Sequence, residues 1–576
     1  MAAPSSVGST GTSWSKWHVA LIVGAPVAFG IGYWYLRQSG NAGSKEKRSL
    51  ADRSKGGASS IAATSQISLD GTGTEDNAEI QSSESLLKKA LGCKTVGNEH
   101  FKAGRYEDAI KSYNQAIEFC PKENTMDLAT FYQNRAAAYE QLKMYKEVQE
   151  DCSHALELNP KYVKALQRRA KACELTQDLP QSLEDITAAC ILEGFQNQNT
   201  LLTADRILKE LGKVHAKEAM ANRKTIMPSK HFIKTYFSSF IEDPITNSIK
   251  NESDVAEADL RGFAQAQNAF KKLNFEEIVP ACTEEIESDG DNKFKALVLR
   301  ATFYLLMGDH VNALKDFETV ISDESIDAKL RVNALIKRAS LYMQLEQPDK
   351  SIEDFNQAAR LDPSNSDVYH HRGQVHLLME KVKEAMDDFK AAVSLNPNFP
   401  IAYVQKCYTD YRYAFQSHDM EKMQEVMKNF TLAVKKFPEC SECYTLFAQV
   451  LCDQQEYEKA DSYFRKAIEV EPENAAVYVH RGLLQLQWTG DVNKAIEFIT
   501  QALKMDDRCE FGYETLGTIE VQRGNLKHAV DLFDKAIPLA KTELEMSHLF
   551  SLRNAAVAQA SVAEKMGIPL TSATGP

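Results

Sequence analysis

The sequence predicts an all-α protein, a superhelical solenoid of about eleven helical repeats behind a single N-terminal transmembrane helix. Two observations lead to this fold class. Small and bulky apolar residues recur every 34 residues over about two thirds of the chain, and residues 18–36 contain no Lys, Arg, Asp or Glu. With 43% hydrophobic and 26% charged residues, the chain is neither a polytopic membrane protein nor wholly disordered.

The anchor is predicted at residues 18–36, after a short segment at 1–17. Nineteen helical residues reach about 28 Å, which spans a bilayer. A cleaved signal peptide is the alternative, disfavoured because the apolar run is long and only Lys16 precedes it. Six basic residues follow within 37–55, so the positive-inside rule places the large C-terminal part in the cytosol. Aromatic residues suited to the two membrane interfaces flank the run: Trp14, Trp17, Tyr33, Trp34 and Tyr35.

Residues 37–88 are predicted to form a disordered tether, because they are rich in Ser, Gly, Thr, Ala and Asn and almost free of aromatic residues. The net charge of −13 argues against a nucleic-acid partner. The eleven cysteines are odd in number and scattered over predicted helices, which favours reduced thiols over a disulfide framework.

The repeats begin at Ala90. Counted from there, Gly97, Ala109, Tyr113 and Ala116 occupy positions 8, 20, 24 and 27, the pattern of the 34-residue tetratricopeptide repeat. Small residues at 8, 20 and 27 let two helices pack closely, and a bulky residue at 24 fills the gap between them. We expect three repeats in 90–196 and eight in 259–541, of which 259–290 matches poorly.

Two further segments complete the solenoid. A dividing segment at 197–258 contains a predicted helix at 200–223 and then a less regular join. At the C-terminus, residues 542–576 comprise a capping helix at 543–566 and a tail, and the helix is expected to cover the apolar face of the last repeat.

Catalysis is not indicated by any motif: there is no phosphate-binding loop, zinc-protease helix or nucleophile elbow. We predict no enzyme activity, no catalytic residues, no cofactor and no metal. Cys440 and Cys443 form a lone CxxC, which without a second pair is interpreted as incidental. His370 and His371 are adjacent, so they point in different directions on a helix and suit solvation better than shared metal binding.

Five polar residues form a register in the first three repeats. Lys94 and Asn98 share one helix face, as do Lys164 and Arg168, and Asn134 lies 34 residues before Arg168. Taken singly, Lys and Arg on helices are usually solvated surface residues. Five in register should instead converge on the groove of the superhelix, where cationic and amide donors suit the two carboxylates of a C-terminal Asp.

These runs, Lys94-Thr-Val-Gly-Asn98, Asn134-Arg-Ala-Ala-Ala-Tyr139 and Lys164-Ala-Leu-Gln-Arg168, resemble the two-carboxylate clamp of tetratricopeptide co-chaperones. The resemblance implies chaperone binding, through the Glu-Glu-Val-Asp tails of the cytosolic seventy- and ninety-kilodalton heat-shock chaperones. The whole layout is similar to the seventy-kilodalton receptor family of the outer-membrane translocase, the TOM complex. It implies a non-enzymatic protein-import receptor in the mitochondrial outer membrane, with other translocase subunits and preproteins as partners.

In that family the C-terminal repeats receive hydrophobic preproteins with internal targeting signals, notably inner-membrane carriers. Projecting the clamp positions onto the last four repeats predicts an apolar groove, with packing between helices as the alternative for any one residue. The predicted preprotein-binding residues are Val404, Tyr408, Leu446, Gln449, Val479, Leu483, Phe511 and Thr518. The anchor itself does not specify an organelle, so a chaperone-docking scaffold on another membrane, such as the endoplasmic reticulum, stays the alternative.

Overall fold

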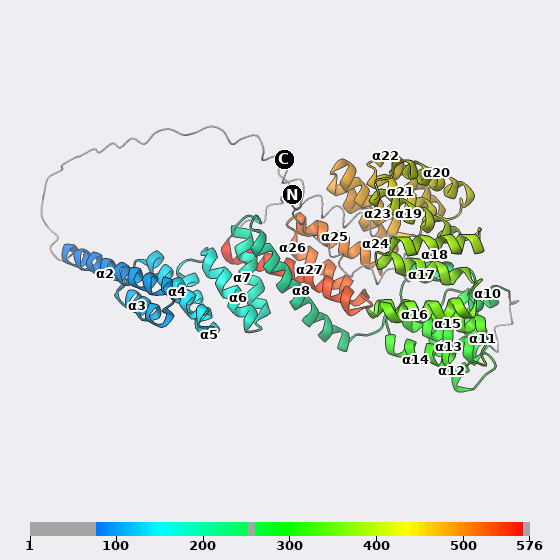
Figure 1. Ribbon diagram of the computed structural model, residues 1–576, viewed down its shortest axis with the longest axis horizontal. Coiled ribbons are helices and arrows are strands. Elements are labelled where there is room, and N and C mark those ends of the chain that lie inside the picture. Colours follow the sequence, from blue (N-terminus) through cyan, green and yellow to red (C-terminus); the bar gives the residue numbers. More distant parts are fainter. Residues whose placement is uncertain (1–75, 252–259, 568–576) are drawn as a thin grey trace, which may run out of the picture. The chain divides into compact units, whose positions relative to one another are not determined.

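The computed structural model describes residues 76–251 and 260–567 (Figure 1). The predicted segment 1–17, the anchor 18–36 and the tether up to residue 75 lie outside these residues. Throughout the described part the regular elements are helices, which confirms the predicted all-α class. None of these described helices has both the length and the apolar character needed to cross a bilayer.

Eleven successive helix pairs make up most of the described chain, three before and eight after a set of intervening helices, as the repeat count predicts. The first helices of the pairs are α2 (Asp76–Lys102), α4 (Thr125–Gln141), α6 (Val163–Leu175), α11 (Gly262–Lys271), α13 (Lys293–Met307), α15 (Ala328–Gln344), α17 (Ser366–Leu378), α19 (Pro400–Gln416), α21 (Ser441–Asp453), α23 (Ala475–Thr489) and α25 (Glu510–Gln522). The second helices are α3 (Tyr106–Phe119), α5 (Tyr145–Leu158), α7 (Leu179–Leu192), α12 (Ile278–Glu287), α14 (His310–Ser322), α16 (Pro348–Leu361), α18 (Val382–Leu395), α20 (Met420–Lys436), α22 (Tyr457–Val470), α24 (Val492–Met505) and α26 (Leu526–Ala536). Short 3-10 helices adjoin two of them, η3 (Phe275–Glu277) before α12 and η4 (Ile537–Leu539) after α26.

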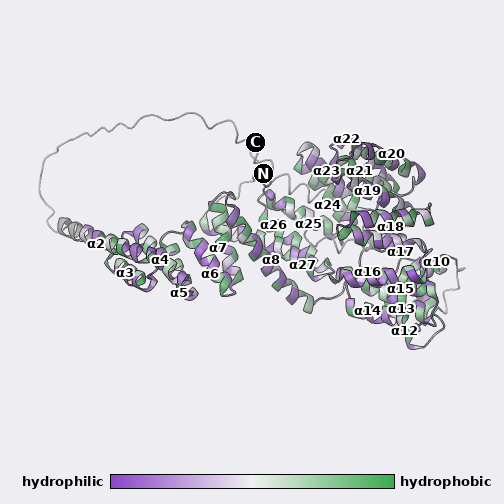
Figure 2. Cartoon of the chain, viewed as in Figure 1, coloured by the Kyte–Doolittle hydropathy of each residue, from purple (hydrophilic) through white to green (hydrophobic). Residues whose placement is uncertain are grey.

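In the pairs α2–α3 and α17–α18 the two helices pack closely because one residue of the first helix is a glycine. A Cβ atom at Gly97 would lie 2.6 Å from the Tyr113 ring, and one at Gly373 would lie 3.2 Å from the Phe389 ring. The alanines at the two other small positions are fully buried: Ala109, Ala116, Ala385 and Ala392. Figure 2 shows apolar and hydrophilic residues interspersed along the helices, as expected for elements that bury one face.

The described residues divide into two compact units. The first, here called the N-terminal unit, contains residues 76–215, 521–530 and 550–567, and the second, the C-terminal unit, contains residues 216–520 and 531–549 apart from the undescribed 252–259. Each unit has its own buried apolar clusters. The five predicted clamp residues all fall in the N-terminal unit, and the eight predicted preprotein residues all fall in the C-terminal unit.

The helical part starts earlier than predicted. Helix α2 begins at Asp76, so the prediction of a disordered tether is wrong for residues 76–88. This stretch contains no Gly or Pro, and it is continuous with the helix that packs against α3. The packing of the later part of α2 against α3 therefore supports a longer helix than the local composition predicts.

The dividing segment is more regular than predicted. It contains α8 (Gln198–Ala221), α9 (Lys230–Ser238) and α10 (Pro244–Asn251). Just before α10, the Asp243 carboxylate accepts a hydrogen bond from the Lys337 ammonium at 2.7 Å, and both side chains are fully buried. Although burial alone would raise the pKa of Asp243, Lys337 and the backbone N–H groups of Ile245 and Thr246 hold that pKa below its ordinary value. This ion pair holds the segment before α10 against α15.

The C-terminal helix forms at the predicted place, as α27 (Glu543–Met566). From Phe550 onward, however, it belongs to the N-terminal unit, where Val562 lies in one cluster with Ala188 and Ala558 lies in another with Leu211. The helix thus does more than cover the last repeat, because its second half completes the core around α7 and α8.

The adjacent histidines of α17 correct another expectation. His370 and His371 are both buried rather than solvated. The His370 ring lies 4.8 Å from the Phe399 ring, and the His371 ring lies 4.2 Å from the Phe240 ring, measured between centroids. Burial lowers the pKa of His371 to about 4 and that of His370 well below its usual value, so both rings are neutral core residues.

Candidate functional site

The predicted clamp residues lie on the first helices of three successive pairs. Lys94 and Asn98 belong to α2, Asn134 to α4, and Lys164 and Arg168 to α6. Lys164 is exposed, and the other four are partly buried. This is the placement expected of residues that line the groove of a repeat superhelix.

Asn98 and Asn134 are in contact. The Asn134 amide donates to Asn98 Oδ1 at 3.4 Å, and the Tyr113 hydroxyl donates to the same oxygen at 2.8 Å. Because Tyr113 packs where Gly97 has no side chain, the close packing of α2 on α3 also orients Asn98. Burial raises the pKa of Tyr113 to about 12, so its hydroxyl keeps the proton it donates.

Arg168 is held by a carboxylate that sequence analysis missed. Its Nε donates to Glu140 Oε2 at 2.8 Å, while the Lys171 ammonium donates to Glu140 Oε1 at 2.7 Å. Burial would raise the pKa of Glu140, but the hydrogen bonds from Lys171 and Arg168 outweigh burial and lower it. The Nη1 atom of Arg168 is buried and has no hydrogen-bond partner. The guanidinium group of Arg168 is thus oriented by the hydrogen bond of its Nε atom, and its Nη1 atom is a donor that is not yet used.

Lys94 and Lys164 are held less firmly. The Lys94 ammonium lies 5.8 Å from the centroid of the Phe131 ring, a weak cation–π contact. Lys164 is exposed. The structure therefore joins Asn98 to Asn134 directly, and the three cations lie on α2 and α6.

A second set of arginines supports the helix pairs. In five pairs an Arg of the first helix binds an Asp sixteen residues later, on the second helix, and at least one side chain of each pair is nearly buried. The five are Arg135–Asp151, Arg169–Asp185, Arg300–Asp316, Arg338–Asp354 and Arg372–Asp388. Because each of these arginines binds its aspartate through two nitrogens, they act in the repeat framework and differ from Arg168. The recurrence of an Arg followed sixteen residues later by an Asp is visible in the sequence, and it could have indicated these ion pairs.

The predicted preprotein residues are mostly in the core. Val404, Leu446 and Val479 are fully buried, and Leu483 is nearly so, within the apolar clusters of the C-terminal unit. Their predicted place on an accessible groove surface is wrong, because they fill the space between helices. Gln449 is also buried, with its amide nitrogen 3.4 Å from His480 Nε2. The three that are partly exposed are Tyr408, Phe511 and Thr518.

A cavity of about 480 Å³ lies in the C-terminal unit, and of the eight predicted residues Phe511 lines it. Its wall combines apolar side chains with acidic ones. The apolar residues include Met227, Phe232, Ile401, Val477, Phe511 and Leu539. The acidic residues are Glu439, Glu442, Glu471, Asp506, Glu510 and Glu545.

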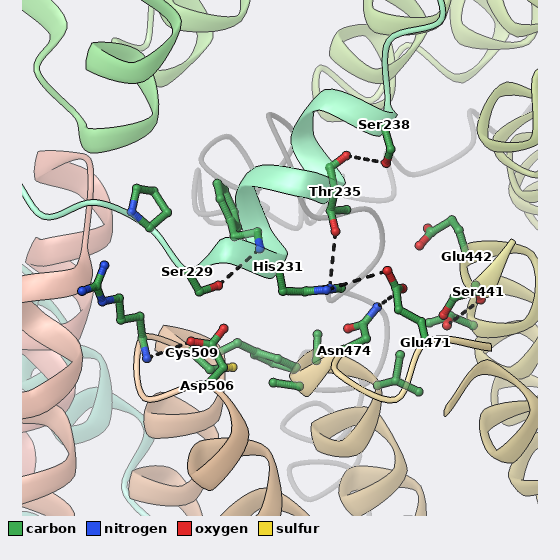
Figure 3. A pocket seen from close by; sticks show the side chains of 18 of the residues that line it. Ser229, His231, Thr235, Ser238, Ser441, Glu442, Glu471, Asn474, Asp506 and Cys509 are labelled. Atoms are coloured by element: carbon green, nitrogen blue, oxygen red, sulfur yellow. Dashed lines mark hydrogen bonds and ion pairs between the residues drawn. The ribbon is translucent and has the colours of Figure 1, made fainter. Parts of the chain in front are cut away.

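Figure 3 shows His231 between Thr235 and Glu471 in this cavity. His231 Nε2 lies 3.4 Å from the Thr235 hydroxyl, and His231 Nδ1 lies 3.7 Å from Glu471 Oε1. Asn474 donates to the other oxygen of Glu471 at 2.9 Å. Polar groups from α9 and from the turn after α22 thus face one another across the wall.

Burial changes the charges of the cavity wall. It raises the pKa of Glu442 and of Glu510 well above the ordinary carboxyl value, and nearby acidic residues add to the effect. Burial also lowers the pKa of Lys541 to about 8, and its ammonium sits 3.5 Å from the Phe232 ring centroid. Glu442 and Glu510 thus keep their protons to a higher pH than ordinary glutamates do, and the apolar side chains of the wall can contact apolar groups.

Comparison with known proteins agrees with the repeat architecture. The tetratricopeptide repeat pattern matches residues 97–143, 129–162, 332–365, 366–399 and 441–474. The mitochondrial import receptor subunit TOM70 of mouse (Mus musculus) is 48% identical to the chain over 96% of its length, covering 93% of the relative. The human (Homo sapiens) TOM70 is 47% identical over the same shares of the two chains.

The chain belongs to the TOM70 family. It is accordingly a mitochondrial protein-import receptor, and this favours the mitochondrial interpretation over a scaffold on the endoplasmic reticulum. A solved structure of the yeast TOM70 is similar to this chain, with 25% sequence identity and a TM-score of 0.47. The match includes 84% of this chain and 99% of the yeast chain. Membership of the TOM70 family implies a location at the mitochondrial outer membrane, and a receptor built from tetratricopeptide repeats points to a non-enzymatic role.

Proposed function

We propose that this receptor docks cytosolic seventy- and ninety-kilodalton heat-shock chaperones through Lys94, Asn98, Asn134, Lys164 and Arg168. The observation that carries the proposal is the placement of these five on consecutive first helices, with Asn98 and Asn134 in contact. A chain that ends in Glu-Glu-Val-Asp offers two carboxylates at its last residue. Three cations and an amide donor can neutralise and orient both of them.

Arg168 is the decisive contact in this proposal. Its guanidinium is oriented by Glu140 and keeps an unpaired Nη1 donor, so a tail carboxylate can be bound with little further ordering of the side chain. Losing such a charge-assisted contact typically costs about 2 to 5 kcal/mol of binding free energy. Arg168→Ala should therefore weaken tail binding at least about tenfold.

The test is titration of a Glu-Glu-Val-Asp peptide into wild type and Arg168→Ala at matched salt. Lys171→Ala is the control, because Lys171 also binds Glu140 but its side chain is 61% exposed. We expect it to change the affinity by less than about threefold. Unchanged peptide affinity in Arg168→Ala, with helical content intact, would remove Arg168 from the site.

We further propose that the cavity of the C-terminal unit receives hydrophobic preproteins with internal targeting signals, inner-membrane carriers among them. The mixed wall supports this, since apolar side chains remove an apolar segment from water at roughly 25 cal/mol per Å² and the carboxyl groups of the wall can pair with its polar groups. Within this proposal the partly exposed Tyr408 and Thr518 extend the surface at which Phe511 meets the client.

Phe511→Ser should weaken binding of a carrier precursor and leave tail-peptide binding unchanged. Tyr513→Ser is the matched control, since Tyr513 is a partly buried aromatic residue on the same helix α25 that does not line the cavity. Equal losses in the two variants would mean that helix packing, not the cavity wall, explains the effect.

We also propose that residues 18–36 anchor the chain by a single pass in the outer membrane and that it works with other translocase subunits. The charge-free run and the basic residues after it support this topology. Deleting residues 1–40 should release the chain from isolated mitochondria, and retention on the membrane would contradict the assignment.

A further inference from the structure

We propose that Cys440 and Cys443 form a reversible dithiol–disulfide pair in the wall of the cavity. From the sequence alone this CxxC is interpreted as incidental, because the sequence does not show where the two thiols point. The structure places the first at a cavity and the second directly behind it. The inference is independent of what occupies the cavity.

The backbone brings the two thiols within bonding range. Cys440 is the N-cap residue of α21, with φ −100° and ψ 101°, and Cys443 lies in the first turn. The Cys443 N–H donates to the Cys440 carbonyl at 3.1 Å, which closes a tight turn. Side chains three residues apart at the start of a helix lie about 5 to 6 Å apart at Cβ, so a modest adjustment of one turn reaches disulfide geometry.

The two thiols differ in access. Cys440 is partly exposed and lines the cavity, whereas Cys443 is fully buried in the apolar cluster beside it. A small reagent entering the cavity therefore meets Cys440 first. Cys443 can react only with a sulfur already held at Cys440, which is the role of a resolving thiol.

The pKa values of the two thiols also differ, and this difference again favours Cys440 as the thiol that reacts first. The Cys443 thiol donates a hydrogen bond to the Cys440 sulfur, and this lowers the pKa of Cys440. Backbone N–H groups of Cys443 and Glu442 act in the same direction, while burial and the Glu471 carboxylate oppose them. The same hydrogen bond, together with burial, raises the pKa of Cys443. Cys440 is thus the nucleophile of the pair.

The cavity wall beside Cys440 contains an unsatisfied polar group. Glu442 Oε1 is buried without a hydrogen-bond partner, and burial raises the pKa of this carboxyl well above its usual value. A carboxyl whose pKa is raised in this way keeps its proton to a higher pH than an ordinary glutamate does, so it repels a neighbouring thiolate less. A polar molecule bound beside Cys440 would supply the missing partner.

The same cavity holds a reference thiol. Cys509 lines the wall and is partly exposed, but burial raises its pKa to about 12. Access alone would make Cys440 and Cys509 equally reactive. Only Cys440 has both a stabilised thiolate and a second thiol within reach, so a comparison of the two separates the proposed chemistry from simple exposure.

The proposed oxidant is a low-molecular-weight disulfide such as glutathione disulfide. The Cys440 thiolate attacks one of its sulfurs, the sulfur–sulfur bond breaks, and one glutathione leaves as a thiolate that takes a proton from water. Cys443 then loses its proton and attacks the Cys440 sulfur of the mixed disulfide, and the second glutathione leaves and takes up that proton. Two protein thiols are oxidised, and one glutathione disulfide is reduced to two thiols.

The experiment uses the full chain in detergent, equilibrated at a series of ratios of reduced to oxidised glutathione, then alkylated and mapped by mass spectrometry. We expect a Cys440–Cys443 disulfide at ratios that leave Cys509 reduced. If Cys440 and Cys443 stay reduced at every ratio that modifies Cys509, the proposal is overturned. This arm uses the unaltered protein, so it does not depend on how any variant folds.

Two substitutions test the order of attack. Cys443→Ser should accumulate glutathione on Cys440 at least about tenfold faster than on Cys509, because the mixed disulfide cannot be resolved. Cys440→Ser should leave Cys443 unmodified, since that thiol is fully buried. Similar rates at Cys440 and Cys509 in Cys443→Ser would show that no activated thiol exists.

Discussion

At the residue scale, Gly97 couples stability to binding. A Cβ there would lie 2.6 Å from the Tyr113 ring, whose hydroxyl orients Asn98. Gly97→Ala should therefore destabilise the first repeat by about 1 to 3 kcal/mol, the usual cost of overpacking, and also weaken tail binding. Thermal unfolding followed by circular dichroism, together with peptide titration, measures the two effects.

Gly92→Ala on the same helix is the matched control, because a Cβ at Gly92 meets no atom within 4 Å. It should be neutral or stabilising by up to about 1 kcal/mol, since Ala is the better helix former. A destabilisation as large as that of Gly97→Ala would mean that helix propensity, and not the Tyr113 contact, sets the requirement for glycine.

The clamp residues could be predicted from the sequence, but the side chains that hold them could not. Asn134 and Arg168 follow from the repeat period, because equal positions in successive repeats share one face, and Asn98 follows from its four-residue spacing to Lys94 on one helix. Glu140, by contrast, has no periodic counterpart in the predicted set, and only the structure shows it binding Arg168. In the C-terminal unit the period placed Leu446 on the same face, yet neighbouring helices cover it. The repeat position of a residue determines which way its side chain points within a helix pair. Its exposure depends on the other helices that pack against that pair.

At the element scale, the Arg–Asp pairs join the two helices of a repeat. Arg300 and Asp316 illustrate this on α13 and α14, with 15% and 6% of their side chains exposed. Arg300→Met alone leaves the Asp316 carboxylate nearly buried and unpaired, so it should cost about 3 kcal/mol. The double variant Arg300→Met, Asp316→Leu should cost less than the sum of the two single variants by at least about 1 kcal/mol.

Urea unfolding of the four proteins of this cycle provides the measurement. The exposed pair Lys209–Asp205 on α8 is the control, because both side chains are more than half exposed and such pairs contribute little. Additive effects for Arg300 and Asp316 would show that the two helices are joined by apolar packing alone.

The helices themselves were largely predictable, because the repeat pattern specifies both the pairs and their order. The predictions failed where no period applies. Helices α9 and α10 lie between repeats, and their position depends on the buried contact of Asp243 with Lys337, nearly a hundred residues away in sequence. Likewise, the second half of α27 joins the N-terminal unit through contacts such as the Ser551 hydroxyl with the Leu208 carbonyl at 3.1 Å. Long-range contacts of this kind leave no local signal.

At the scale of the whole molecule, buried titratable groups make stability depend on pH. Burial lowers the pKa of His480 to about 4, from an ordinary value of 6.5. Between these two values the unfolded chain binds a proton that the folded chain does not, so this histidine stabilises the fold above pH 6.5 and that contribution is lost as the pH falls towards 4. Buried carboxyls act oppositely. Burial raises the pKa of Glu514 to about 7, so the folded chain holds a proton there that the unfolded chain releases.

Buried histidines and buried carboxyls have opposite effects on the pH dependence of stability. The contribution of one histidine is therefore measured by comparing a variant with wild type. His480→Gln removes one histidine contribution, so the stability difference between wild type and variant should shrink by up to about 1.4 kcal/mol per pH unit as the pH falls from 6 to 5. His418→Gln, at an exposed position, is the matched control, and its difference from wild type should not change with pH. Urea unfolding at pH 7, 6 and 5 measures both. A difference for His480→Gln that stays constant over this range would mean that the ring is hydrated in the folded state, which would contradict its place between Phe464 and Phe511.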